Sequence, residues 1–144
     1  MPKVTTMVAF VALLTVVAAG VAYAAMIVGN ANDNTLTGTS SADTIRAFGG
    51  NDIVRALSGR DTIYGGYGAD QLYGGRYGDT IYGGKGTDRL YGSYGDDHIV
   101  SRDLNSSGIG QRDVVDCGPG FDTFKSDWDD QVLGNCEEGS TSGA

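Results

Sequence analysis

The sequence predicts an all-β fold built from short repeats that stack on one another. Three observations lead to this prediction: a nine-residue period from residue 29 to residue 100, a branched aliphatic residue at the same place in every period, and 24 glycines among 144 residues. Glycine at this frequency, without a Gly-X-Y period, indicates recurring tight turns rather than a collagen helix. A three-residue strand gains stability only when many copies stack, so the pattern predicts a solenoid.

Each nine-residue unit divides into a six-residue turn and a three-residue strand. The turn is rich in glycine, asparagine, serine and aspartate, which favour tight and left-handed conformations. The eighth position always carries a branched aliphatic residue, and the alternation around it places that side chain on one face of the strand. We expect these residues to form the core: Leu36, Ile45, Val54, Ile63, Leu72, Ile81, Leu90 and Ile99.

The sixth position is almost as regular as the eighth. Asn34 occupies it in the first unit, and the other seven units carry Asp43, Asp52, Asp61, Asp70, Asp79, Asp88 and Asp97. Residues 65–73 (GGYGADQLY) and 83–91 (GGKGTDRLY) match the pattern G-G-x-G-x-D-x-U-x in full, where U is a large apolar residue. The units therefore resemble the repeats of the RTX, or haemolysin-type, calcium-binding family over half of the chain. The resemblance implies a right-handed parallel β-roll with two units per turn, hence four turns for the eight units.

The resemblance also implies that several calcium ions lie between successive turns. Stacking every second unit brings the aspartates into two columns, one along each edge, where like charges repel unless a cation lies between them. Calcium accepts about six to eight oxygen ligands, whereas magnesium requires a smaller octahedral shell. By resemblance, the ligands are the seven sixth-position aspartates and carbonyl groups of the turns. The glycines that best match the family pattern are Gly65, Gly66, Gly68, Gly83, Gly84 and Gly86.

Several turns depart from the glycine pattern, and we expect these departures to weaken metal binding. Residues 29–46 lack glycine at the fourth position, so we interpret them as a degenerate cap and leave open whether they bind metal. Ala47 and Ala56 replace the leading glycine of their units. The best predicted pocket therefore lies between residues 65–70 and residues 83–88.

Four tyrosines share the ninth position of consecutive units, which predicts two aromatic ladders on the outer faces. These residues are Tyr64, Tyr73, Tyr82 and Tyr91. Such ladders most often stabilise a sheet by cross-strand pairing. An exposed aromatic strip could also bind a glycan or a protein. The alternative function is therefore a calcium-dependent adhesion or matrix module.

Residues 1–24 have the features of an export signal. Lys3 and the amino terminus supply positive charge, an apolar segment follows, and Ala22-Tyr23-Ala24 is a small-x-small cleavage site. We expect cleavage after Ala24 and a secreted, extracellular protein with no membrane span in the mature chain. The alternative is an uncleaved anchor, because the apolar stretch from residue 7 to residue 28 is long enough to span a bilayer.

The chain has two cysteines, Cys117 and Cys136. In an exported protein such a pair usually forms a disulfide. Following the repeat domain of residues 25–100, we expect residues 101–144 to form a disulfide-stapled cap that covers the open end of the roll. Residues 137–144 are small and polar, and we expect them to be frayed.

The nine-residue frame breaks after residue 100 and resumes at residue 108. Residues 101–107 have the composition of an inserted loop, and the two units that follow carry Asp113 and Asp122 at their sixth position. Whether residues 108–125 bind metal stays open. We interpret the remaining acidic residues of this segment as a solvated loop: Asp127, Asp129 and Asp130.

The charge balance and the motifs exclude several function classes. Ten basic residues face eighteen acidic ones, the formal charge is −8 and no basic cluster occurs, so nucleic acid and anionic membranes are not expected partners. Neither H-E-x-x-H nor G-x-S-x-G occurs, and His98 is the single histidine, so we expect no enzyme. A carboxylate-pair glycosidase stays open on residue types, although the repeats leave little chain for a substrate groove. The predicted function is calcium binding by repeats that fold around Ca²⁺.

Overall fold

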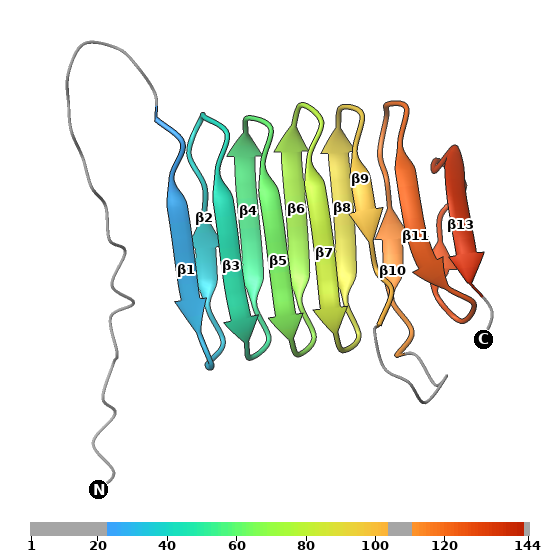
Figure 1. Ribbon diagram of the computed structural model, residues 1–144, viewed down its shortest axis with the longest axis horizontal. Helices are drawn as coiled ribbons and strands as arrows, with labels where there is room; N and C mark the ends of the chain where they lie inside the picture. The colour runs from blue at the N-terminus through green and yellow to red at the C-terminus, as the bar shows by residue number, and fades with distance from the viewer. Residues whose placement is uncertain (1–22, 104–110, 143–144) are drawn as a thin grey trace, which may run out of the picture.

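The computed structural model describes residues 23–103 and 111–142, so most of the predicted export signal lies outside the described residues. Within them the chain forms a parallel β-solenoid of about six turns and contains no helix (Figure 1). No helix in these two ranges has the length and apolar character needed to cross a bilayer. The predicted all-β solenoid is therefore confirmed.

The strands alternate between two sheets. One sheet has seven strands in the order β1-β3-β5-β7-β9-β11-β13, and the other has six in the order β12-β10-β8-β6-β4-β2. The first sheet contains β1 (Met26–Asn30), β3 (Thr44–Gly49), β5 (Thr62–Tyr67), β7 (Thr80–Lys85), β9 (His98–Val100), β11 (Thr123–Asp127) and β13 (Glu138–Ser142). The second contains β2 (Thr35–Thr37), β4 (Ile53–Ser58), β6 (Gln71–Arg76), β8 (Arg89–Tyr94), β10 (Val114–Asp116) and β12 (Gln131–Val132).

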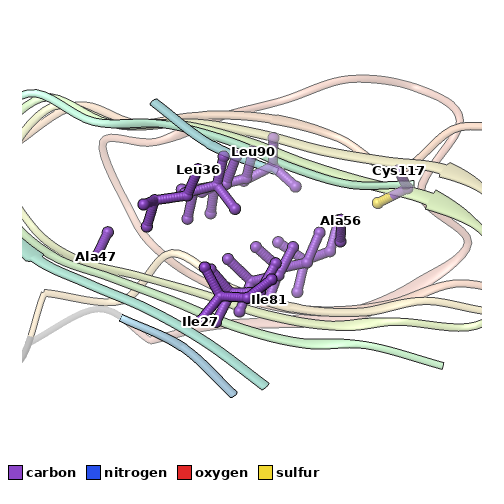
Figure 2. Packing of buried hydrophobic residues seen from close by; sticks show 13 residues of the cluster. Ile27, Leu36, Ala47, Ala56, Ile81, Leu90 and Cys117 are labelled. Atoms are coloured by element: carbon purple, nitrogen blue, oxygen red, sulfur yellow. The ribbon is translucent and has the colours of Figure 1, made fainter. Parts of the chain in front are cut away.

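The core is a double column of aliphatic side chains between the two sheets. Every eighth-position residue of the repeats is at most 4% exposed, and Ile27 and Val115 extend the columns at the two ends. Figure 2 shows Leu36 and Leu90 on one side of the core facing Ile81 on the other. From β1 to β9, each paired residue lies 18 positions from its partner in the sequence, so that Ile63 pairs with Ile81. This is the two-units-per-turn arrangement that the resemblance implies.

The long strands have six residues, not the three that the sequence analysis expects. β5 runs from Thr62 to Tyr67 and therefore includes the glycine pair that opens the next unit. Gly66 pairs with Gly84 in the neighbouring strand. Both glycines have positive φ angles, so the backbone bends at this position while the ladder continues. The turn is thereby confined to the fourth to sixth positions, where the aspartates lie.

The solenoid has about six turns rather than four because the C-terminal segment continues both sheets. β10 pairs with β8, and β11 pairs with β9. The paired residues are 25 positions apart in the sequence, and residues 104–110, which are not described, lie between them. The tail, expected to be frayed, forms β13 against β11. The predicted disulfide between Cys117 and Cys136 is confirmed, with 5.3 Å between the two Cα atoms.

Candidate metal centre

The sixth-position aspartates lie along the two edges of the solenoid, where the chain turns from one sheet to the other. Each precedes a strand that pairs in parallel with the strand one turn later, so the side chains of one column repeat in register. Asp52, Asp70 and Asp88 belong to one edge, and the other predicted aspartates belong to the opposite edge. All seven are buried, with at most 3% of each residue exposed.

Each column is joined by a ladder of hydrogen bonds from backbone to side chain. The N–H of Asp52 donates to Oδ1 of Asp70 at 2.8 Å, and the N–H of Asp70 donates to Oδ1 of Asp88 at 2.9 Å. The same bond, at 2.7 or 2.8 Å, joins Asp43 to Asp61, Asp61 to Asp79, Asp79 to Asp97, Asp88 to Asp113 and Asp97 to Asp122. The ladder was not predicted from the repeats, although the 18-residue spacing of the aspartates within each column is its signal.

The second carboxylate oxygen, Oδ2, has no such partner. It is buried and accepts no hydrogen bond from the described residues in Asp52, Asp61, Asp70, Asp79, Asp88, Asp97, Asp113 and Asp122. A buried carboxylate oxygen without a partner is costly unless a proton or a cation compensates it. These oxygens therefore mark eight positions at which a cation would compensate a buried carboxylate, and two of them, in Asp113 and Asp122, belong to the units whose metal binding the sequence leaves open.

Asp43 differs from the other aspartates of the repeats. Its Oδ1 accepts the N–H of Ala25 at 2.8 Å, and its Oδ2 accepts the N–H of Thr39 at 2.6 Å. Both oxygens are thus engaged: the backbone N–H at the second position of this unit points at Oδ2, and the hydroxyl of Thr39 adds a bond to Oδ1 at 3.1 Å. Asp43 closes the N-terminal end of its column.

Burial raises the pKa of eight column aspartates: Asp52, Asp61, Asp70, Asp79, Asp88, Asp97, Asp113 and Asp122. The ladder hydrogen bonds lower each pKa in part, and the carboxylates of neighbouring turns raise it again. The resulting pKa is about 6 for Asp70 and Asp97, about 7 for Asp79 and Asp88, and about 9 for Asp113. At neutral pH, protons therefore compete with a cation for these groups.

Glycine at the first position keeps a small space free beside Oδ2 in four turns, those of Asp70, Asp79, Asp88 and Asp97. A Cβ atom on Gly74 would lie 2.5 Å from Oδ2 of Asp79 and 2.7 Å from the carbonyl oxygen of Gly92. The carboxylate of one turn and a carbonyl of the next thus face the same space. Gly65 and Gly92 have the same arrangement. The methyl groups of Ala47 and Ala56, both fully buried, occupy this position in two earlier turns.

The predicted glycines at the second and fourth positions direct carbonyl groups along the stack. Their φ angles are positive, for example 127° at Gly68 and 140° at Gly86. A Cβ atom on Gly68 would collide with the carbonyl oxygen of Gly50, and one on Gly86 would collide with that of Gly68. Carbonyl oxygens of one turn therefore point at the backbone of the next, which places additional oxygen donors between turns.

This donor set suits a hard cation. Across residues 23–103 and 111–142, no three Asp, Glu, His or Cys side chains converge into a metal cluster. A cation between two turns would therefore take one or two carboxylate oxygens and draw its other ligands from backbone carbonyls. Calcium binds such mixed oxygen sets readily, because it accepts many ligands in flexible geometry. The residues present thus fit the ion that the family resemblance implies.

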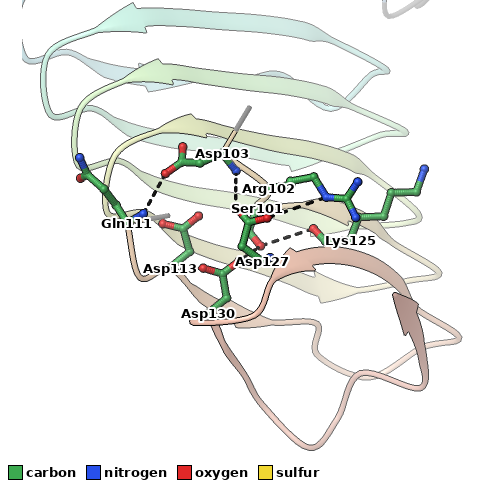
Figure 3. Close-up of polar contacts among 8 residues, drawn as sticks. All are labelled: Ser101, Arg102, Asp103, Gln111, Asp113, Lys125, Asp127 and Asp130. Atoms are coloured by element: carbon green, nitrogen blue, oxygen red, sulfur yellow. Dashed lines mark hydrogen bonds and ion pairs between the residues drawn. The ribbon is translucent and has the colours of Figure 1, made fainter. Parts of the chain in front are cut away.

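The C-terminal acidic residues close one column instead of forming a solvated loop (Figure 3). Asp130 takes the place of the next aspartate: its Oδ1 accepts the N–H of Asp113 at 3.0 Å, and its Oδ2 accepts the hydroxyl of Ser101 at 2.7 Å. Asp127 accepts the N–H of Asp103 at 3.0 Å. The interpretation of Asp127 and Asp130 as solvated is therefore wrong. Their carboxylates accept the backbone N–H groups of the buried Asp103 and Asp113, which have no aspartate of a following repeat to bond.

The other column ends in the same way. The N–H of Asp122 donates to Oε2 of Glu137 at 3.1 Å. Each ladder thus finishes on an acidic side chain that stands outside the nine-residue frame, which is why sequence spacing does not identify it.

The comparison with known families agrees with this geometry. The model of the RTX calcium-binding nonapeptide repeat, in four copies, matches residues 28–63, 48–76 and 73–103. A search of curated proteins and a search of solved structures each found no match. The matched segments together cover more than half of the chain and contain most of both aspartate columns. The protein therefore belongs to the RTX calcium-binding nonapeptide repeat family.

Proposed function

We propose that this protein is an exported calcium-binding protein whose turns hold Ca²⁺ ions between them. The observation that carries the proposal is the set of eight buried Oδ2 atoms without a hydrogen-bond donor, repeated in register along both edges. Six of the seven predicted aspartates belong to this set, and Asp113 and Asp122 extend it. Asp43 has both oxygens engaged, so we assign it to the closure of its column in place of a full ligand role.

Not all turns are equally suited to the ion. The turns that begin with Gly65, Gly74, Gly83 and Gly92 keep the space beside Oδ2 free, which supports the pocket predicted between residues 65–70 and residues 83–88. We expect weaker sites in the two turns that begin with alanine. The bound ion supplies the positive charge that the stacked carboxylates need, so its binding free energy becomes folding free energy.

Export is supported by the contact at the N-terminal end of the solenoid. Cleavage after Ala24 would convert the nitrogen of Ala25 into an α-ammonium group, 2.8 Å from Oδ1 of Asp43. A neutral hydrogen bond would thereby become a charge-assisted one. The disulfide between Cys117 and Cys136 is also typical of oxidising, extracellular surroundings.

A binding role is also favoured over catalysis. His98, the single histidine, lies on the outer face of β9, where its Nδ1 is 2.7 Å from Oγ1 of Thr123. Its neighbours there are not the buried aspartates, which point into the turns. We therefore propose that the repeating geometry of the turns serves metal binding and not catalysis.

Calorimetric titration of the mature chain with calcium chloride tests the proposal, with magnesium chloride as the control cation. We expect several calcium ions to bind, little response to magnesium, and a gain of β structure by circular dichroism when calcium replaces chelator. A spectrum that is fully β in chelator, together with no heat of calcium binding, would show that the solenoid is independent of metal and would refute the proposal.

A further inference from the structure

The outer faces of the solenoid differ sharply in charge from its edges. Strands β3 to β9 contain no Asp or Glu, whereas they contain five basic residues besides His98: Arg46, Arg55, Arg76, Lys85 and Arg89. The acidic residues of this region all lie in the turns. An acidic protein thus presents cationic, aromatic sheet faces, which the charge balance of the whole sequence conceals.

The two tyrosine ladders do not by themselves offer ring faces to a ligand. Tyr64 and Tyr82 stack with their centroids 5.0 Å apart and 4° between the ring planes, and Arg46 covers the far side of Tyr64 at 5.4 Å. Tyr73 and Tyr91 stack in the same way on the other sheet, at 4.7 Å. The ring faces inside each ladder are therefore occupied, and the tyrosine strip that the sequence suggests as a binding surface is largely closed.

The ladder on the seven-stranded sheet ends at a hollow. In this column Tyr82 pairs with Val100, and Val100 pairs with Lys125. A cavity of about 510 Å³ lies beside this small valine, and Tyr82, Val100 and Lys125 all line it. This volume lies in the range of about 300–1,000 Å³ that is usual for small-molecule sites.

The lining of the hollow is basic. Lys85, His98, Arg102 and Lys125 surround it, together with Tyr67 and Tyr82, and no acidic residue lines it. Arg102 is partly neutralised, since its Nε lies 4.0 Å from Oδ1 of Asp127. The two lysines form no ion pair with any described residue, and Nζ of Lys85 lies 5.3 Å from the ring centroid of Tyr67. Neither lysine is neutralised by a described acidic group, so both charges can attract an anionic ligand.

We propose that this hollow binds an acidic sugar unit of an anionic polysaccharide. A pyranose ring presents a face of C–H groups that packs on an aromatic ring such as Tyr82, and a carboxylate on that sugar would reach Lys85 or Lys125. A polysaccharide also suits the site because the surface continues along the sheet toward Arg46, so neighbouring sugar units reach this cation and the edges of the stacked tyrosines. This role goes beyond calcium binding and needs calcium only to keep the sheet folded.

The test is binding of hyaluronan oligosaccharides, which carry one glucuronate per disaccharide, to the calcium-loaded protein by calorimetry. Chito-oligosaccharides of the same length are the neutral control, and inorganic phosphate and phosphatidylglycerol vesicles are the other anionic probes. We expect hyaluronan to bind at least about tenfold more tightly than each of these, because the site combines an aromatic face with two cations.

Two variants locate the binding. Lys85→Gln with Lys125→Gln removes the free cations, and Val100→Tyr extends the ladder by one ring and fills the hollow while it keeps every charge. Each should weaken hyaluronan binding about tenfold or more. The matched control, Arg60→Gln with Arg112→Gln, removes two positive charges from exposed turns and should leave binding unchanged.

Three results would overturn the proposal: no binding of hyaluronan by the wild-type protein, an equal loss in both double variants, or a preference for phosphate or lipid vesicles. Circular dichroism in calcium checks that each variant is folded, and Lys125→Gln alone replaces any variant that is not. Because calcium titration of the same samples is independent of the oligosaccharide, failure of this proposal is distinguishable from failure of the calcium proposal.

Discussion

Replacing Asp70 by asparagine should stabilise the calcium-free solenoid and weaken calcium binding, two effects of opposite sign from one nearly isosteric change. Asp70 lies in the middle of its column and is 1% exposed. Asparagine keeps an Oδ1 that accepts the N–H of Asp52, now 2.8 Å away. It also replaces Oδ2, which lies beside the same space as the carbonyl oxygen of Gly83, by an amide donor. We expect this donor to bond the carbonyl, so that the variant needs no cation there. The chain itself carries Asn34 at this position in its first unit.

The magnitude follows from the pKa of Asp70, which burial raises from 3.8 to about 6. A shift of this size corresponds to about 3 kcal/mol of penalty for the charged form above pH 7. Water at the edge of the solenoid relieves part of it, so we expect asparagine to raise the free energy of unfolding in chelator by about 1–2 kcal/mol. In calcium the variant loses a ligand oxygen and its charge, which should lower the affinity about tenfold or more.

The assay is urea unfolding followed by circular dichroism at pH 8, in chelator and in saturating calcium, together with calorimetric titration. Asp116→Asn is the matched control: it makes the same charge change on the outer face of β10, where Oδ1 of Asp116 accepts a bond from Asn135 at 2.6 Å. We expect little change in calcium affinity for this control. If Asp70→Asn destabilises the calcium-free protein and leaves calcium affinity intact, the assignment of the Oδ2 atoms to metal is wrong.

Three further results are expected. Burial raises the pKa of Asp79 from 3.8 to about 7, so between these two pH values the folded state binds more protons than the unfolded state. In chelator, the urea concentration at the unfolding midpoint should therefore fall as the pH rises from about 4 to about 7. Calcium affinity should rise over the same range, because fewer protons compete for the carboxylate. Constant midpoints and constant affinity would contradict this. Cys117→Ser with Cys136→Ser opens a loop of 19 residues and should cost about 3 kcal/mol, with hydrogen exchange faster in β10 to β13 than in β5 to β7; uniform acceleration would count against a local staple. Mass spectrometry of exported protein should find Ala25 at the N-terminus, and an intact Met1 would disprove the predicted cleavage. Asp43→Asn should destabilise this mature form more than the uncleaved chain, and equal losses would disprove the charge-assisted contact between Ala25 and Asp43.

The register of the fold could be predicted because one residue type recurs at one position. A branched aliphatic residue at every eighth position identifies the side chains that each strand buries, and the two units per turn that the family resemblance implies then place Ile63 beside Ile81. The strand ends could not be predicted in the same way. Glycine pairs such as Gly65-Gly66 are typical of turns, yet parallel neighbours on both sides keep them in the ladder.

The two C-terminal coils illustrate the limit of the repeat pattern. Residues 126–142 contain no nine-residue unit, but β12 and β13 still pair with β10 and β11, since the open end of a parallel sheet offers unpaired N–H and C=O groups. The sequence predicts a cap there. Only the contacts of the last turn decide that the cap consists of further strands and that Asp130 and Glu137 terminate the columns.

By itself, the sequence determines which residues form the core, which carboxylates stack and which family the chain resembles, because each follows from a period counted along the chain. The tertiary structure alone decides what each carboxylate oxygen contacts: Oδ1 accepts an N–H from the previous turn, Oδ2 stays free, and Asp43 is the exception because Thr39 reaches it. It also decides that a hollow lined by Lys85, Arg102 and Lys125 lies beside Tyr82 and Val100. The shape of this hollow depends on how side chains of neighbouring turns pack, and the repeat period does not contain that information.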